Sequence, residues 1–177
     1  MAEGRQQVSN ERKQAYITLS QGFFAVVDAE DVPRLGSFSW FIYRPSASDR
    51  LIYAVRKVRT GVGRYTKRLM HRDVLVMSDN FEVDHKNGNG LDNRKENLRP
   101  ATASQNQANA RQHVDAGYSQ YKGVTFHKIT RRWQASVQCN KKRRFFGGFK
   151  TEKEAAEAYN KEAAKVFGEY ARLNEIV

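Results

Sequence analysis

Cysteine is almost missing from this sequence, which has only Cys139 among 177 residues. One cysteine allows no internal disulfide and no cysteine-based metal cage, and the four histidines lack the spacing of zinc ligands. Long hydrophobic runs are missing too, since the longest, such as FFAVV at 23–27, fall far short of the roughly 20 apolar residues of a spanning helix. The polar leader 1–14 contains no signal-peptide core. We therefore expect a cytoplasmic protein without a membrane span.

Acidic charge is scarce relative to basic charge. The chain has 31 Lys and Arg against 19 Asp and Glu, a net charge of +12. Residues 1–50 are neutral, with six charges of each sign, so the excess lies in residues 51–117 and 118–177. This excess favours a polyanionic partner such as nucleic acid, although a basic stretch is also common on an ordinary solvated surface. Charge alone does not distinguish a nuclease from an RNA-binding protein.

The first third of the chain is predicted to be rich in β-strands. Apolar residues make up 40% of the sequence, which is enough for a core, and the length suits one domain or two small ones. Alternating and β-branched residues predict two strands within 15–27, further strands at 39–44, 51–58 and 63–67, and short helices at 28–35 and 68–77. Asp28 is a plausible N-cap of the first helix.

The last third is predicted to form three strands and one helix. Strands are expected at 121–127, 132–138 and 143–149; in the second, Trp133, Ala135 and Val137 alternate with polar residues. Thr151 and Glu154 have the spacing of a capping box, so a helix begins there. A helix that covers one face of a three-stranded antiparallel sheet leaves the other face open. The chain as a whole is therefore predicted to be α+β.

Residues 83–99, VDHKNGNGLDNRKENLR, contain the side chains best suited to chemistry. Asp84 and His85 end a short strand and enter a loop rich in Gly and Asn, and a helix is expected from Thr102. A neutral imidazole can take a proton from water, and a neighbouring carboxylate can hold a hard cation such as Mg²⁺. One base and one divalent cation suffice for phosphodiester hydrolysis. An Asx-rich loop with an incidental Asp-His pair is the alternative for that pair alone.

The complete string resembles the HNH endonuclease family, also called His-Me finger or ββα-metal nucleases. The resemblance covers roughly residues 65–111. It rests on these matches: Val83-Asp84-His85, Asn87-Gly88-Asn89, Asp92-Asn93, Glu96-Asn97-Leu98-Arg99, Asn106 with Asn109, and Leu69-Met70-His71-Arg72, which is similar to phage and intron-encoded homing nucleases. The resemblance implies a ββα-metal core.

Roles for individual residues follow from this resemblance. It implies that His85 is the general base, that Asp84 and Asn106 bind a single Mg²⁺ or Mn²⁺, and that Asn97 ties the loop so that His85 is oriented. Many family members have a histidine where Asn106 stands, so Asn109 is a rival ligand. Arg72 and Arg99 are candidate phosphate contacts, and His71 is more typical of a packed or surface residue than of a catalyst.

Residues 121–174 resemble the apetala-two/ethylene-response-factor DNA-binding domain. The matching elements are Tyr121-Lys122-Gly123-Val124, Trp133-Gln134-Ala135, Phe146-Gly147-Gly148-Phe149-Lys150-Thr151, Glu154-Ala155-Ala156, Ala158-Tyr159, Ala163-Ala164, Gly168 and Asn174. In that family the sheet lies in the major groove and the helix packs behind it. The open face would carry Thr125, His127, Gln134, Ser136, Gln138, Arg143 and Phe145, while Arg131, Arg132, Lys141 and Lys142 suit phosphates. A small domain with merely solubilising charges is the alternative.

Together these patterns predict a site-directed DNA endonuclease of the homing type, encoded by a phage or an intron. The expected parts are a flexible leader (1–14), a β-rich region (15–64), an HNH core (65–111), a linker (112–120) and an apetala-two-type domain (121–177). We expect double-stranded DNA as partner, one divalent cation per active site, and a monomer or weak dimer that nicks. The rivals are a non-catalytic DNA-binding regulator with a decayed HNH scaffold and an RNA-binding protein.

Overall fold

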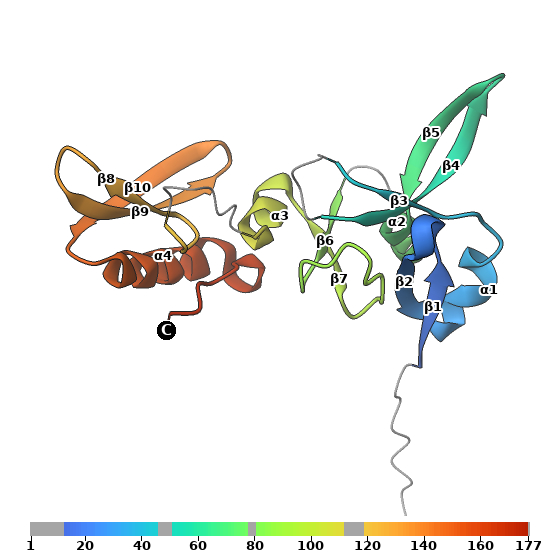
Figure 1. Cartoon of the computed structure of the whole chain (residues 1–177), viewed down its shortest axis with the longest axis horizontal. Helices are drawn as coiled ribbons and strands as arrows, with labels where there is room; N and C mark the ends of the chain where they lie inside the picture. The colour runs from blue at the N-terminus through green and yellow to red at the C-terminus, as the bar shows by residue number, and fades with distance from the viewer. Residues whose placement is uncertain (1–12, 46–50, 78–80, 112–118, 177) are drawn as a thin grey trace, which may run out of the picture. The chain divides into compact units, whose positions relative to one another are not determined.

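The computed structural model describes residues 13–45, 51–77, 81–111 and 119–176 (Figure 1). They form a mixed α/β structure with several small antiparallel sheets and few helices. Two compact units are present, residues 1–77 with 89–98 and residues 78–88 with 99–177. The predicted leader and linker lie almost entirely outside the described residues, and the predicted domain boundaries stay a prediction. No helix in the described parts is long and apolar enough to cross a membrane.

The first unit begins with an antiparallel hairpin of β1 (Gln14–Thr18) and β2 (Phe24–Asp28), as predicted. The short helix η1 (Ser20–Gly22) connects the strands. β2 also binds the glycine-rich loop: Val26 N–H donates to the Leu91 carbonyl at 2.8 Å, and Asn93 N–H donates to the Val26 carbonyl at 2.7 Å. These bonds hold part of the sequence motif on the hairpin.

Asp28 stands at the predicted N-cap position, but its side chain does not act as a cap. The helices η2 (Ala29–Asp31) and α1 (Val32–Leu35) do follow this residue, but its side chain makes no capping bond. Instead, Asp28 Oδ2 accepts a hydrogen bond from the Lys95 N–H at 2.9 Å. A partner 67 residues away in the sequence has therefore replaced the local one.

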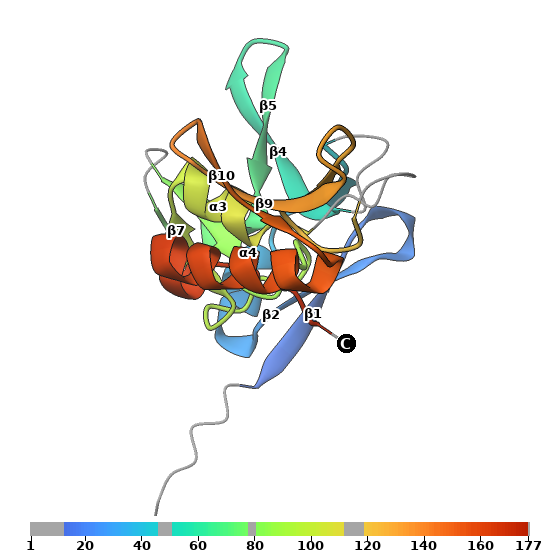
Figure 2. The same ribbon diagram turned by 90° about the vertical axis from the view of Figure 1, so that its left-hand side faces the viewer.

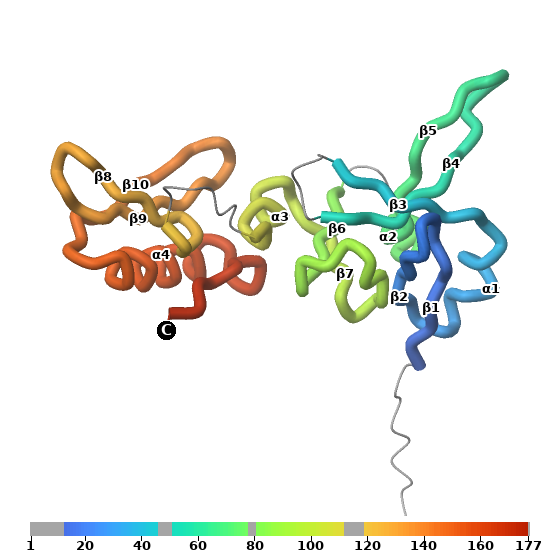
Figure 3. The backbone as a smooth tube through the Cα atoms, in the orientation of Figure 1, coloured from blue at the N-terminus to red at the C-terminus, as the bar shows by residue number. Residues whose placement is uncertain are grey.

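A three-stranded antiparallel sheet completes the first unit, in the order β3 (Phe41–Tyr43), β4 (Tyr53–Gly61), β5 (Arg64–Leu69). Figure 3 traces the chain through the long β4–β5 hairpin and into α2 (Met70–Leu75). Asp73 of α2 accepts hydrogen bonds from Arg56 Nε at 2.6 Å and from Arg68 Nε. Burial acts to raise the pKa of Asp73, but these bonds keep it below its usual value. The ion pairs thus join helix and hairpin.

The second unit contains two sheets and two helices. A two-stranded sheet is made by β6 (Glu82–His85) and β7 (Leu98–Ala101), and α3 (Ala103–Asn109) follows with a Thr102 capping box. An antiparallel sheet in the order β10 (Lys142–Phe149), β9 (Arg132–Cys139), β8 (Val124–His127) comes next. Figure 2 shows α4 (Glu152–Phe167) along one side of this sheet, before η3 (Gly168–Tyr170).

Small residues let α4 approach the sheet closely. Ala155, Ala156 and Ala163 of α4 are fully buried, and Thr151 and Glu154 form the predicted capping box. Gly123 has a φ of +73°, and a Cβ there would meet the Tyr159 ring at 2.2 Å, so only glycine fits. Ala108 of α3 belongs to the same core cluster as residues of β9 and α4. The helix of the sequence motif is therefore packed against the C-terminal layers.

Candidate active site

Asp84 and His85 end β6 and are both buried, with 3% and 5% of their surface exposed. The chain turns directly after them, because the Gly88 N–H donates to the His85 carbonyl at 2.7 Å and Gly88 has a φ of +70°. The same carbonyl accepts from Asn109 Nδ2 at 2.8 Å. Two donors thus fix the main chain from which the imidazole projects.

The Asp84 carboxylate is held by a cation and an amide. Arg99 donates to Oδ2 through Nε at 2.8 Å, and its Nη2 lies 2.7 Å from the same oxygen, so the guanidinium makes a charge-assisted pair with one carboxylate oxygen. Asn109 Nδ2 donates to Oδ1 at 2.8 Å. Since a carboxylate oxygen has two acceptor directions, Oδ1 retains capacity for one further partner.

Arg99, a predicted phosphate contact, lies buried with partners inside the protein. Its Nη1 donates to the Glu169 carbonyl at 2.9 Å and lies 3.4 Å from Glu169 Oε2. The guanidinium also lies over the Tyr170 ring, 3.9 Å from its centroid. A contact with DNA would require Arg99 to exchange these partners.

Asn106 and Asn109, the two rival ligands, have different surroundings. Asn109 is buried, and its Nδ2 donates to Asp84, to the His85 carbonyl and to the Lys86 carbonyl at 3.3 Å. Three acceptors orient that amide as a donor. Asn106 is half-buried, and its Nδ2 donates to Glu82 Oε2 at 2.8 Å. The Asn109 amide thus clamps the main chain around His85, while the choice between Asn106 and Asn109 as a cation ligand stays a prediction.

Asn97 ties the loop of the first unit. Its Nδ2 donates to the Asp92 carbonyl at 2.7 Å. The Asp92 carboxylate in turn pairs with Arg94, and this hydrogen bond raises the pKa of Arg94 above its usual value. Loop support by Asn97 thus has a structural basis, while orientation of His85 stays a prediction.

His71 and Arg72 lie on α2 of the first unit. His71 is buried, and its ring meets Tyr53 edge-on with centroids 6.0 Å apart. This contact matches the expectation that His71 is a packed residue. Arg72 is half-buried, and its role as a phosphate contact stays a prediction.

The predicted DNA-reading residues share one face of the C-terminal sheet. Gln134, Ser136 and Gln138 of β9 stand opposite Thr125, Phe145 and Arg143 respectively in the strand register, and His127 stands opposite Arg132. Phe145 is 60% exposed. The remaining basic residues Arg131, Lys141 and Lys142 are exposed at or beside the turns. The structure thus places the predicted base-reading residues on one face of the sheet, and DNA binding by this face stays a prediction.

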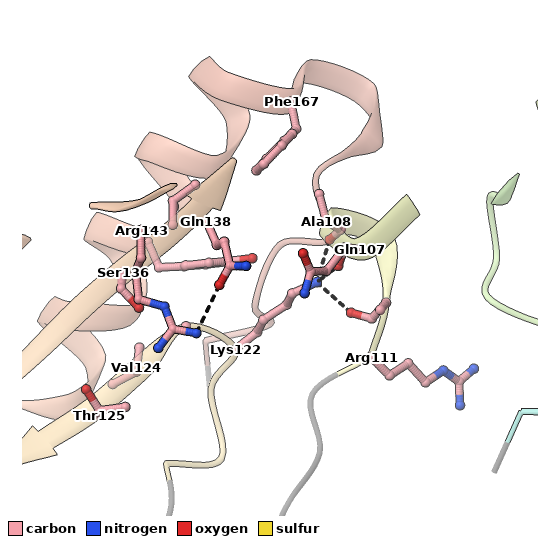
Figure 4. A pocket seen from close by; sticks show the side chains of 14 residues that line it. Gln107, Ala108, Arg111, Lys122, Val124, Thr125, Ser136, Gln138, Arg143 and Phe167 are labelled. Carbon is pink, nitrogen blue, oxygen red and sulfur yellow. Dashed lines mark hydrogen bonds between the residues drawn. The ribbon is translucent and has the colours of Figure 1, made fainter. Parts of the chain in front are cut away.

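A pocket of about 500 Å³ lies where the end of α3 meets β8 and β9 (Figure 4). Thr125, Ser136, Gln138 and Arg143 line it, and Arg143 donates to Gln138 Oε1 at 3.1 Å. Lys122 also lines this pocket. It was not identified from the sequence as a site residue, because Lys122 appears there only as part of the match to the apetala-two domain. Burial, with a smaller effect of Arg172, lowers the pKa of Lys122 to about 8.

A separate acidic group, Asp28, Glu30 and Asp31, occurs in the described part of the first unit. Lys95 Nζ pairs with Glu30 at 2.6 Å and with Asp31 at 3.2 Å, and Arg34 also pairs with Asp31. Lys95 and Arg34 therefore already engage Glu30 and Asp31 of this group.

Known proteins resemble the two parts of the chain. A family model described as HNH endonuclease matches residues 77–108. An uncharacterized HNH endonuclease of Acanthamoeba polyphaga mimivirus is 32% identical over 165 residues, which cover 91% of this chain and 81% of that protein.

The C-terminal part is similar to plant proteins. An AP2-like ethylene-responsive transcription factor of Arabidopsis thaliana is 41% identical over 59 residues, 33% of this chain and 12% of that protein. APETALA2-like protein 2 of Oryza sativa subsp. indica is 43% identical over 56 residues, 32% of this chain and 13% of that protein. No solved structure matches the chain significantly. Because the viral similarity extends over most of both proteins, the chain belongs to the HNH endonuclease family.

Proposed function

We propose that this protein is a DNA endonuclease that hydrolyses phosphodiester bonds in duplex DNA. His85 is the general base, and Asp84 and Asn106 hold one divalent cation, Mg²⁺ or Mn²⁺. The observation that carries the proposal is the buried Asp84-His85 pair at the end of β6, whose carboxylate and carbonyl are both fixed by Asn109. Such fixed positions suit chemistry better than a solvated loop does.

The donor set fits a hard cation. Asp84 Oδ1 accepts one hydrogen bond and retains a second acceptor direction, and Asn106 offers a neutral amide oxygen. Glu82, which accepts from Asn106, adds negative charge nearby. When bound, the cation would polarise the scissile phosphate and stabilise the leaving 3′ oxygen.

His85 takes the proton of the attacking water. Side chains of consecutive strand residues point to opposite faces, so the imidazole and the Asp84 carboxylate act on different sides of β6. The bonds from Gly88 and Asn109 to the His85 carbonyl fix the main chain that carries the imidazole. Hydrolysis in this manner leaves 5′-phosphate and 3′-hydroxyl ends.

The C-terminal part is proposed to be an apetala-two-type domain that carries the enzyme to its site on DNA. The polar face of β8, β9 and β10 supports this, because Gln134, Gln138 and Arg143 can pair with base edges in the major groove. The exposed turn residues supply phosphate contacts. Homing-type action in the cytoplasm, by a monomer or weak dimer that nicks one strand, completes the proposal.

A plasmid-nicking assay tests the chemistry. We expect His85→Ala to slow nicking of supercoiled DNA by about 1,000-fold, since general-base catalysis contributes about 10²–10⁴-fold. Lys153→Ala, an exposed change on α4, is the matched control and should nick as the wild type does. The His85→Ala chain should still bind Mn²⁺, which separates lost chemistry from lost folding.

Binding measurements test the partner. Duplex DNA should compete better than RNA, and affinity should fall steeply with salt because several phosphates are contacted. Specific DNA binding without nicking by the wild type would instead identify a regulator with a decayed nuclease site. Preferential binding of RNA would overturn the DNA proposal altogether.

A further inference from the structure

We infer that the C-terminal part of the chain positions the candidate metal ligands, with Lys122 and Tyr170 as positioning residues of the nuclease site. The inference rests on the function proposed above. It goes beyond that function because the C-terminal part then has a role in catalysis in addition to its role in binding DNA. Two independent sets of contacts within the second unit support it.

The first set joins Lys122 to the end of α3. Its Nζ donates to the carbonyls of Gln107, Ala108 and Ala110 at 3.1, 2.5 and 2.6 Å. Terminal carbonyls of a helix lack partners within the helix, and a cation there also interacts favourably with the helix dipole. Because α3 has only seven residues, this one ammonium caps the helix that carries both Asn106 and Asn109.

Lys122 is itself held in place. Its N–H donates to Asn174 Oδ1 at 2.7 Å, and its carbonyl accepts from Asn174 Nδ2 at 3.1 Å. Arg172 adds bonds to α3, with its N–H donating to the Ala108 carbonyl at 3.2 Å. The helix end is therefore fastened to two separate segments of the C-terminal part.

The second set reaches Asp84 through Arg99. The Tyr170 ring lies against the Arg99 guanidinium, and the Tyr170 hydroxyl donates to the Pro100 carbonyl at 2.9 Å. The Glu169 carbonyl accepts from Arg99 Nη1. These contacts fix the guanidinium whose Nε and Nη2 both contact Asp84 Oδ2, so η3 helps to determine where that carboxylate can point.

Lost positioning and lost charge have opposite effects on cation binding, which makes the inference testable. Removing a positive charge near Asp84 would by electrostatics alone strengthen binding of a cation. If Lys122 positions α3, its removal weakens binding instead. Tyr170 carries no charge, so Tyr170→Ala changes position alone.

The experiment measures Mn²⁺ affinity of the full chain by calorimetry and by the Mn²⁺ electron paramagnetic resonance signal. We expect Lys122→Met and Tyr170→Ala each to weaken Mn²⁺ binding by about 10-fold, the lower end of the effect of partners that orient metal ligands. The nicking rate at saturating DNA should fall similarly, while DNA affinity in EDTA stays within about twofold of the wild type. Lys122→Arg, which keeps donors for the carbonyls, should restore most of the affinity. Lys153→Met is the matched control.

Each other outcome has a defined meaning. Unchanged Mn²⁺ affinity in both variants overturns the inference, as does a variant that loses DNA affinity while it binds Mn²⁺ normally, because Lys122 would then be a DNA contact. If Lys122→Met does not fold, Tyr170→Ala decides. A wild-type chain that neither binds Mn²⁺ nor nicks DNA overturns the proposed function itself, and the inference with it.

Discussion

Asp73 in the first unit and Asp84 in the second are both buried carboxylates that bind arginine, yet they differ in the number of cations. Asp73 accepts from two guanidiniums, those of Arg56 and Arg68, which engage both of its oxygens. Asp84 accepts from one guanidinium, and its second oxygen has a neutral amide as partner. Two positive charges leave a carboxylate no attraction for a metal ion, whereas a single one leaves an oxygen that can bind it. The number of arginines bound to each carboxylate therefore distinguishes Asp73, a structural residue, from Asp84, a candidate ligand.

We expect the largest effect from Asp73→Asn, on the stability of the first unit. Asp73→Asn leaves two guanidiniums without their counter-ion, so we expect the first unit to lose about 3 to 5 kcal/mol of stability. Trp40 lies in the first unit and Trp133 in the second, so ¹⁹F NMR of a 5-fluorotryptophan-labelled chain can follow urea unfolding of each unit separately. Only the Trp40 signal should move to lower urea. Equal shifts of both signals would contradict the assignment of Asp73 to the first unit alone.

Asp84→Asn should reduce the affinity for a cation, whereas Asp73→Asn should reduce stability. We expect Mn²⁺ affinity to fall about 100-fold or more, since partners of ligands alone account for 10- to 100-fold. Calorimetric titration measures this, and Asp73→Asn, studied where it is folded, is the matched control that should bind Mn²⁺ normally. Retained Mn²⁺ binding in Asp84→Asn would remove Asp84 from the ligand set.

The ion pairs of Asp73 also make the stability of the first unit depend on pH. The pKa of Asp73 is below its usual value, so its ion pairs contribute fully above the unfolded value of about 3.9 and are lost as the pH falls through the folded value. We expect the Trp40 unfolding midpoint in urea to decline below about pH 4, and to decline less in Asp73→Asn. An identical decline in both chains would show that other groups control acid unfolding.

The smallest expected effect concerns the rim of the Asp84 site. Glu169 Oε2 lies 3.4 Å from Arg99, but that side chain is 72% exposed, so the pair contributes less than about 1 kcal/mol. Glu169→Gln keeps the main-chain carbonyl that accepts from Arg99. We expect Mn²⁺ affinity within about twofold of the wild type, measured as above. A larger loss would mean that the exposed carboxylate, and not the carbonyl, holds Arg99.

Local patterns in the sequence predicted much of the fold. The strands of the β1–β2 and β9–β10 hairpins follow from the alternation of apolar and polar residues. The capping box follows from the spacing of Thr151 and Glu154, three residues apart. The Asp84-His85 pair was likewise visible as a motif. Such features depend on neighbours in the chain.

Features that depend on distant partners were not predictable. Asp28 binds Lys95 instead of capping its helix, and Arg99 binds Asp84 and Glu169 instead of facing solvent. Lys122 Nζ contacts the Ala108 carbonyl 14 residues earlier in the chain, and no local pattern in the sequence relates the two positions. In each case a polar side chain could serve several partners, and only tertiary packing decides which one it meets.

The contacts between Asn174 and Lys122 can form only late in synthesis, because residue 174 lies close to the end of the chain. Asp84 and His85 emerge from the ribosome early, whereas Glu169, Tyr170 and Asn174 emerge some ninety residues later. Domains generally fold as their residues emerge. A nascent chain therefore presents the Asp84 loop before the partners of Arg99 and Lys122 exist, and the complete arrangement forms only once residue 174 has been added.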